Sequence, residues 1–265
     1  MSGFVTPVAP LFVPADRPER FAKAAASGAD AVILDLEDAV APDRKAMARA
    51  ALACDFTEKP VIVRINGVGT PWHREDVAAV AGLPFAAIML PKAERAQEVA
   101  ALAASMPVIA LVETARGIAA VREIAQDGGA LALTLGTVDY VADLGCEHTR
   151  EALLAARSEI VLASRLGGLG PPIDGVTLDV RSGGSALDDA RHARALGFGG
   201  KLAIHPAQVA PILQGMAPAP RECEWARRVL DSGDGAVALD GMMIDEPVRA
   251  RARAILRRAA AIGRG

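Results

Sequence analysis

Two carboxylates, Glu113 and Asp139, are the residues of this sequence best placed to bind a metal ion. Each follows a short apolar run, 108–112 for Glu113 and 131–135 for Asp139. If these runs are neighbouring strands of a parallel barrel, both acids lie on the same rim. No His or Cys stands in register with them, and oxygen ligands alone favour a hard cation such as Mg²⁺. The alternative is that each acid caps the following helix or pairs with Arg64.

Arg64 ends a further apolar run, 61–63. A guanidinium at the mouth of a barrel can bind a substrate carboxylate or stabilise an oxyanion that develops during a reaction. We therefore interpret Arg64 as a substrate-binding and catalytic residue. A structural ion pair with Glu37 or Asp38 is the alternative, and the two roles are compatible.

Three acids, Asp35, Glu37 and Asp38, follow the run 31–34. Side chains alternate along a strand, so Asp35 and Glu37 point to the same side. We interpret the three acids as supports that orient Arg64 or the water molecules of a bound metal. For Asp38, a place in the acidic first turn of the next helix is the alternative.

Backbone N–H groups, in addition to the charged side chains, could bind an anionic substrate. Gly136 and Thr137 stand just before Asp139, and residues 114–117 follow Glu113 and open a helix. Unpaired N–H groups at the start of a helix attract anions. We therefore expect Gly136 and Thr137 to contact the substrate.

The elements that must position these residues are eight short apolar runs, most of which end on a charged or polar residue. Helical patterns lie between them, so the sequence predicts an α/β fold, a (β/α)8 TIM barrel. Active sites of such barrels lie at the C-terminal ends of the strands, which brings the charged residues to one rim. The runs are 8–13, 31–34, 61–63, 87–90, 108–112, 131–135, 176–178 and 202–204, and the helices are 18–27, 42–54, 73–81, 93–105, 115–126, 147–166, 185–196 and 206–214.

The chain of 265 residues is only slightly longer than such a barrel, which typically needs ~250 residues. We predict a catalytic barrel over residues 1–216 and a C-terminal extension over 217–265, which is too short to be an independent domain. After a Pro-rich linker the extension predicts a helix (222–230), a β-hairpin with an Asp240-Gly241 turn, and a last helix (247–261). The extension must pack on the barrel or on another subunit.

Composition excludes several other classes of protein. The net charge of −3 and the pI of about 5.9 indicate no basic nucleic-acid footprint. The apolar runs are far shorter than the ~20 residues of a membrane span, and no secretory signal is visible. The three cysteines are widely spaced and predict neither disulfides nor a zinc site. We expect a cytoplasmic protein that binds a small molecule.

Several segments in fixed order resemble the citrate lyase β-subunit-like branch of the HpcH/HpaI aldolase superfamily, and the resemblance spans essentially the whole chain. A set of motifs in order is far more specific than any single motif. The segments are Leu11-Phe12-Val13-Pro14-Ala15-Asp16-Arg17, Ile33-Leu34-Asp35-Leu36-Glu37-Asp38, Val63-Arg64-Ile65-Asn66-Gly67, Met89-Leu90-Pro91-Lys92, Glu113-Thr114-Ala115-Arg116-Gly117 and Ile204-His205-Pro206.

The resemblance implies a Mg²⁺-dependent carbon–carbon lyase that acts on a 3-hydroxy-3-carboxyacyl-CoA such as citryl-, malyl- or citramalyl-CoA. Retro-Claisen cleavage would give a 2-oxo acid and an acyl-CoA, and the reverse condensation is equally implied. By the same resemblance Glu113 and Asp139 are metal ligands and Arg64 is the substrate arginine. Asp245 would reach the active site of a neighbouring subunit and transfer protons there. The expected assembly is a homo-oligomer, a trimer or a dimer of trimers.

Two segments depart from the family pattern. Gly136-Thr137-Val138-Asp139 stands where the family often reads Gly-Ala-Glu-Asp, so Val138 removes a carboxylate beside the metal ligand. Metal affinity or substrate choice can therefore differ. Ala9-Pro10 stands where the family often carries a basic residue, which weakens the transfer of CoA-phosphate contacts to that position.

Two other functions stay open on the sequence alone. One is a class II pyruvate aldolase that acts on oxo acids without CoA. The other is a non-catalytic subunit, because citrate lyase β chains work within a larger complex on an acyl-carrier thioester.

Overall fold

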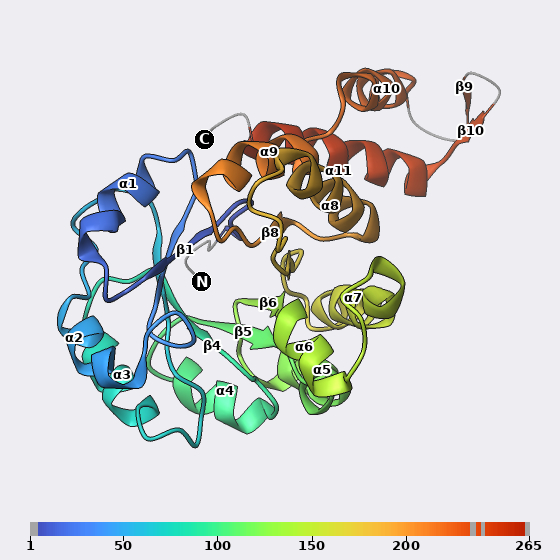
Figure 1. Cartoon of the computed structure of the whole chain (residues 1–265). Helices are drawn as coiled ribbons and strands as arrows, with labels where there is room; N and C mark the ends of the chain where they lie inside the picture. Colours follow the sequence, from blue (N-terminus) through green and yellow to red (C-terminus); the bar gives the residue numbers. More distant parts are fainter. Residues whose placement is uncertain (1–4, 234–236, 240–241, 263–265) are drawn as a thin grey trace.

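The computed structural model describes residues 5–233, 237–239 and 242–262. Eight parallel strands pair in chain order and curl into a barrel with helices around it (Figure 1). A parallel bridge between Leu11 and Ala203 brings the segment after the last strand back to the first. The predicted α/β barrel is confirmed. Its strands are β1 (Leu11–Pro14), β2 (Val32–Asp35), β3 (Val61–Arg64), β4 (Ala87–Leu90), β5 (Val108–Val112), β6 (Ala132–Leu135), β7 (Ile173–Asp174) and β8 (Gly200–Lys201).

The helices of the barrel follow the strands in the expected alternation. Two of them begin with a 3-10 turn that has Pro at its first position, where the missing N–H is not needed. These turns are η1 (Pro18–Arg20) and η2 (Pro42–Arg44), and the helices are α1 (Phe21–Ala25), α2 (Lys45–Ala50), α3 (His73–Val80), α4 (Ala96–Ala103), α5 (Ala115–Asp127), α6 (Thr137–Leu144), α7 (Arg150–Leu166), α8 (Gly183–Leu196) and α9 (Pro206–Met216).

The core has two layers because successive side chains of a strand point to opposite faces. Ile33, Ile62 and Ile109 belong to the buried cluster inside the barrel. Their neighbours Leu34 and Val63 belong to the larger cluster between the strands and the helices. Aliphatic side chains dominate both layers, as a sequence with 3% aromatic residues requires. The strands are thereby fixed in register, and their C-terminal ends meet at one rim.

Two strands lie elsewhere than predicted. β7 was expected at 176–178 and β8 at 202–204, but both strands lie earlier in the chain. The prediction was wrong because it followed apolar runs, whereas these strands carry the fully buried charges Asp174 and Lys201, 3.5 Å apart. Arg157 of α7 lies 3.0 Å from Asp174 and completes the buried group. The run 176–178 is therefore free to form a loop at the rim.

Helix α6 was not predicted at all, although it carries a candidate metal ligand. It begins immediately after β6 and ends at Gly145, whose left-handed backbone (φ 68°) suits glycine. Asp139 therefore lies in the first turn of a helix and not at the end of a strand.

The C-terminal extension folds as helix α10 (Pro220–Asp231), a hairpin of β9 (Val237–Leu239) and β10 (Met242–Ile244), and helix α11 (Glu246–Ile262). Ala226, Val229, Ile244 and Ala252 form a small core of their own. The predicted hairpin is confirmed, and its Asp240-Gly241 turn lies outside the described residues. Figure 1 shows the hairpin projecting away from the barrel. The division at residue 217 stays a prediction.

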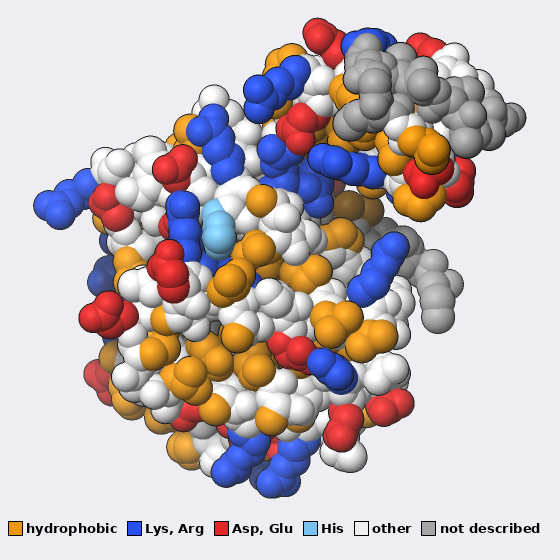
Figure 2. All heavy atoms as spheres, turned by 90° about the vertical axis from the view of Figure 1, so that its right-hand side faces the viewer, with side chains coloured by type: hydrophobic (Ala, Val, Ile, Leu, Met, Phe, Trp, Pro, Cys, Tyr) orange, Lys and Arg blue, Asp and Glu red, His pale blue; other side chains and the backbone are white. Residues whose placement is uncertain are grey.

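The surface beside this extension mixes charged and apolar side chains. On the face in Figure 2, Lys and Arg gather toward the upper centre and apolar side chains gather below them. Large apolar side chains that stay exposed include Leu154, Leu162 and Leu166 of α7. No helix among the described residues is long and apolar enough to cross a membrane.

Candidate active site

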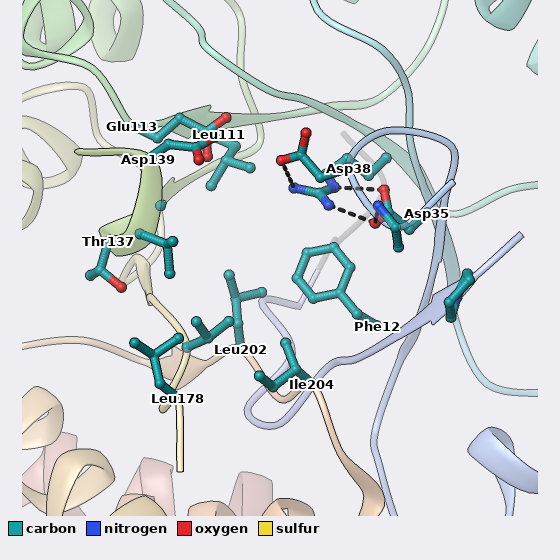
Figure 3. Close-up of a pocket in the computed structure, with 16 residues that line it drawn as sticks. Phe12, Asp35, Asp38, Leu111, Glu113, Thr137, Asp139, Leu178, Leu202 and Ile204 are labelled. Atoms are coloured by element: carbon teal, nitrogen blue, oxygen red, sulfur yellow. Dashed lines mark hydrogen bonds and ion pairs between the residues drawn. The ribbon is translucent and has the colours of Figure 1, made fainter. Parts of the chain in front are cut away.

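A cavity of about 390 Å³ opens at the C-terminal ends of the barrel strands (Figure 3). It gathers side chains from strands and loops all around the rim, and it contains most of the predicted site residues. Its lining is Phe12, Pro14, Asp35, Asp38, Ala39, Arg64, Leu111, Glu113, Gly136, Thr137, Val138, Asp139, Val176, Leu178, Leu202 and Ile204.

Glu113 follows β5 and is only 3% exposed. The backbone N–H of Lys92 donates to its Oε1 over 3.0 Å. A Cβ on Gly136 would lie 2.5 Å from the Cβ of Glu113, so the absence of a side chain there makes room for the carboxylate. Burial, and then the nearby carboxylates of Glu37 and Asp139, raise the pKa of Glu113 to about 8.

Asp139 projects from the first turn of α6 toward Glu113, and the two carboxylates lie together in Figure 3. The ammonium of Lys92 lies 3.1 Å from Oδ2 of Asp139, 2.7 Å from Oε1 of Glu37 and 4.0 Å from Oε1 of Glu113. The backbone of Lys92 is left-handed (φ 49°), which is uncommon for a residue other than glycine. Lys92 is thus the cation that this acidic cluster holds next to the two predicted ligands.

This pair of carboxylates fits a Mg²⁺ ion by its chemistry. No group of three or more His, Cys, Asp or Glu that could hold a metal occurs among the described residues. Two carboxylates suffice for Mg²⁺, because that ion keeps several water molecules and takes further oxygens from the substrate. Burial is the main cause of the raised pKa of Glu113, and the nearby carboxylates of Glu37 and Asp139 add to it. A divalent cation would favour the ionised form of this carboxylate.

Arg64 is fixed by acids on two sides. Its Nε and Nη2 donate to Asp35 over 2.7 and 2.5 Å, and its Nη1 lies 2.9 Å from Oε2 of Glu37. Asp38 is more distant, at 3.9 Å, and its side chain is 60% exposed. The guanidinium also lies 4.8 Å from the ring centre of Phe12. The predicted ion pair with Glu37 is therefore present, and the principal partner is Asp35.

The two segments predicted to bind anions, residues 114–117 and the start of α6, differ in which backbone N–H groups lack a hydrogen-bond acceptor. The N–H of Ala115 donates to Asp143 over 2.7 Å, and the N–H of Gly117 donates to the hydroxyl of Thr114 over 3.0 Å. Residues 114–117 are therefore a helix cap rather than an anion site. At α6 the N–H of Gly136 donates to Val112, but the next N–H groups open the helix and have no acceptor within it.

Two neighbours of the cavity, Lys92 and His148, were not among the predicted site residues. Oγ1 of Thr137 lies 2.9 Å from Nε2 of His148, which comes from the loop after α6. A Cβ on Gly175 would lie 2.5 Å from Cγ2 of Thr137, so that side chain is enclosed on two sides. Lys92 could have been found because it follows β4 by two residues, but nothing in the sequence marked His148.

Asp245 does not line the cavity of its own barrel among the described residues. It is exposed and lies between β10 and α11, where its Oδ1 accepts from the N–H of Val248 over 3.2 Å. In this position Asp245 caps the last helix. Its predicted role in catalysis therefore depends on a second subunit.

Comparison with known proteins shows which family and which structures the chain is similar to. Residues 9–206 match the HpcH/HpaI aldolase/citrate lyase family. The chain is 44% identical to a citrate lyase subunit beta-like protein of Mycobacterium tuberculosis, over 94% of each chain. It is 35% identical to a (3S)-malyl-CoA thioesterase of Cereibacter sphaeroides, over 95% of this chain and 94% of that one. The structure of CitE from M. tuberculosis with magnesium, acetoacetate and coenzyme A superposes with a TM-score of 0.87 at 43% identity, covering 96% of this chain and 98% of that one.

Proposed function

The chain belongs to the HpcH/HpaI aldolase/citrate lyase family, and from that premise we propose that it is a Mg²⁺-dependent carbon–carbon lyase. Its substrate is a 3-hydroxy-3-carboxyacyl-CoA, which it cleaves to a 2-oxo acid and an acyl-CoA or forms from them. The observation that carries the proposal is the meeting of Glu113, Asp139 and Arg64 in one cavity at the rim of the barrel.

Glu113 and Asp139 hold the metal in this proposal. When bound there, Mg²⁺ supplies Lewis-acid stabilisation to the hydroxyl and carboxylate oxygens of the substrate. Gly136 and Thr137 lie beside this pair, and the N–H groups that open α6 face an anionic substrate group. Asp35 and Glu37 hold the guanidinium of Arg64 in place.

The residues of the chain then divide the reaction between them. A base takes the hydroxyl proton, and the oxygen on C3 becomes the carbonyl of the 2-oxo acid. The bond between C2 and C3 breaks in the same step, and its electron pair moves onto the thioester as an enolate. Arg64 stabilises the negative charge that shifts during this step. A proton returned to C2 completes the acyl-CoA, and Asp245 of a neighbouring subunit is the group that we propose to deliver it.

We propose that residues 217–265 form an arm that completes a neighbouring active site in a trimer or a dimer of trimers. The support is the hairpin, which projects from the barrel, and the small core that the extension builds for itself. An arm of this kind fits a ring in which each subunit serves the next. Asp245 can cap its own helix and still present its second carboxylate oxygen to a neighbour.

The purified chain alone, assayed with citryl-, malyl- and citramalyl-CoA and Mg²⁺, tests the lyase. We expect a 2-oxo acid and an acyl-CoA in equal amounts, and no turnover with EDTA. Free CoA and a hydroxy acid would instead mean thioester hydrolysis, as the name of the C. sphaeroides relative describes. Turnover of CoA-free oxo acids would identify an aldolase, and activity only with added subunits would identify a component of a complex.

Two variants test the metal ligands. Asp139→Ala should lose Mg²⁺ binding by calorimetry and all turnover while its melting temperature stays close to that of the wild type. Asp188→Ala is the matched control, because that acid is 67% exposed on the outside of α8. Wild-type Mg²⁺ affinity in Asp139→Ala would remove Asp139 from the ligand set.

A further inference from the structure

The active-site cavity has two unlike sides. Figure 3 shows the carboxylates of Glu113, Asp139 and Asp38 along one side and Phe12, Leu202, Leu178 and Ile204 along the other. The polar side comes from the segments after β2, β5 and β6, and the apolar side comes from β1 and the segments after β7 and β8. A substrate in this cavity therefore meets charge on one side and hydrocarbon on the other.

Three large apolar side chains at the rim of the cavity are incompletely buried. Val138 is 42%, Leu178 is 55% and Ile204 is 38% exposed, although all three line the cavity. Apolar surface left open beside a polar site is a common mark of a ligand-binding groove. Val138 also lies immediately before Asp139, so part of this wall stands next to the proposed metal ligands.

The charges of the cavity leave no cation for a second substrate carboxylate. Among the described lining residues, four are carboxylates and Arg64 alone is cationic. The guanidinium already pairs with Asp35 and Glu37, and the ammonium of Lys92 is shared by Glu37 and Asp139. The two charges of Mg²⁺ do not balance the carboxylates that remain. One substrate carboxylate can reach Arg64 and the metal, whereas a second would face acids or the apolar wall.

We propose that this site selects its substrate by the group on the hydroxyl-bearing carbon, accepting hydrogen or a methyl group and rejecting a carboxymethyl group. The specificity-determining residues are Leu178 and Ile204 on the apolar side, together with Val138, which lies next to Asp139 on the other side. This inference rests on the proposed lyase function, and in its terms malyl-CoA and citramalyl-CoA are substrates while citryl-CoA is not. Phe12 and Leu202 continue the wall toward the interior of the barrel.

Physical estimates set the size of the effect. One buried methyl group favours binding about fourfold, so kcat/KM for citramalyl-CoA should exceed that for malyl-CoA by about this factor. A carboxylate that loses water without gaining a partner is penalised far more than a missing methyl group. We expect kcat/KM for citryl-CoA to be lower than that for citramalyl-CoA by on the order of a hundredfold.

Initial rates with the three thioesters, each with saturating Mg²⁺, test this ranking in the wild-type enzyme. A kcat/KM for citryl-CoA within tenfold of that for citramalyl-CoA would overturn the inference and leave the lyase function intact. If none of the three is cleaved, the proposed function fails instead. Calorimetric titration with pyruvate and oxaloacetate then still decides the inference, because these oxo acids carry the methyl and carboxymethyl groups. Oxaloacetate binding as tight as pyruvate binding would count against it.

Variants at the rim test which residues make the wall. Leu178→Lys supplies a cation for the second carboxylate, so the citryl-to-malyl ratio of kcat/KM should rise at least tenfold. Leu178→Ala should lower the citramalyl-to-malyl ratio toward one. Val180→Lys is the matched control, because this residue is 39% exposed two positions further on and does not line the cavity. Equal ratios in Leu178→Lys and Val180→Lys would exclude Leu178 from the wall.

Discussion

The guanidinium of Arg64 and the carboxylate of Asp35 form a two-pronged ion pair, with N–O distances of 2.7 and 2.5 Å. Asp35 is almost completely buried at the end of β2, so its position is set by the strand and not by solvent. This pair uses one edge of the guanidinium and turns the remaining donor, Nη1, toward Glu37. The planar guanidinium is therefore needed to contact both acids, and the compact ammonium of a lysine cannot reproduce these contacts.

Arg64→Lys should accordingly fail to support catalysis although it keeps the positive charge. We expect kcat to fall by on the order of 10²–10³, the usual effect of removing one donor to a developing oxyanion. Mg²⁺ affinity, measured by calorimetry, should change little. Arg49→Lys is the control. Arg49 forms an ion pair with the buried Asp76, with an N–O distance of 3.1 Å, and neither residue lines the cavity. Near-normal turnover in Arg64→Lys would reduce Arg64 to a structural partner of Asp35.

Gly136 is required by the carboxylate of Glu113 and not by the backbone conformation of its own turn. Its φ of −93° is open to any residue, but a Cβ would lie 2.5 Å from the Cβ of Glu113. Gly136→Ala should therefore push Glu113 aside and weaken Mg²⁺ binding at least tenfold, with a loss of stability of about 1–3 kcal/mol from overpacking. Calorimetry and thermal melts measure the two effects.

A second glycine provides the matched comparison for Gly136. Gly184 lies in α8, and a Cβ there would meet nothing closer than 3.4 Å. Gly184→Ala should leave Mg²⁺ affinity unchanged and stabilise the helix slightly. If Gly136→Ala also binds Mg²⁺ normally, Glu113 is not held by this close approach.

The barrel could be predicted from the sequence because its central strands are short apolar runs with polar ends. The residues around β5 show this best, since 108–112 was predicted and observed. β7 and β8 could not be predicted, because Asp174 and Lys201 are buried charges that neutralise one another across the sheet. Sequence patterns report hydrophobicity, whereas such strands depend on a partner that only the fold supplies.

The sequence also indicated some, but not all, of the residues that line the candidate site. Arg64 is the last residue of β3 and Glu113 directly follows β5, so both could be named as candidates from position alone. Lys92 follows β4 by two residues and could have been assigned in the same way. His148 could not, because only its contact with Thr137 brings it to the site. The left-handed backbone of Lys92 and the hydrogen bond between His148 and Thr137 leave no mark in the sequence.

Thr137 and His148 should act as one unit. If His148 serves the site only by holding the Thr137 hydroxyl, His148→Ala should weaken pyruvate binding in the wild type but have no further effect in a Thr137→Val background. A double-mutant cycle by calorimetry, with Mg²⁺ present, measures this coupling. His205→Ala is the control, because His205 instead caps α9 through the N–H of Ala207. Additive effects of the two substitutions would show that His148 acts independently of Thr137.

Asp245 should act on a barrel other than its own. It is absent from the described lining of its own cavity and lies next to a hairpin that projects from the barrel. Asp245→Asn should therefore slow turnover while Mg²⁺ binding stays normal. Mixing this slow variant with the inactive Asp139→Ala should raise activity above that of either variant alone, because some sites combine an intact barrel with an intact arm. Random exchange in a ring would give roughly one such site in four.

The control for this mixture is a pair of variants whose substitutions both lie in the barrel. Asp139→Ala mixed with Arg64→Lys should regain nothing, because both changes lie in the barrel and each site then contains at least one of them. Mass spectrometry of isotope-labelled chains must show that subunits exchange under the conditions used. Exchange without recovered activity in the Asp245→Asn mixture would mean that each arm serves its own barrel or none, and the capping contact with Val248 would then be the role of Asp245.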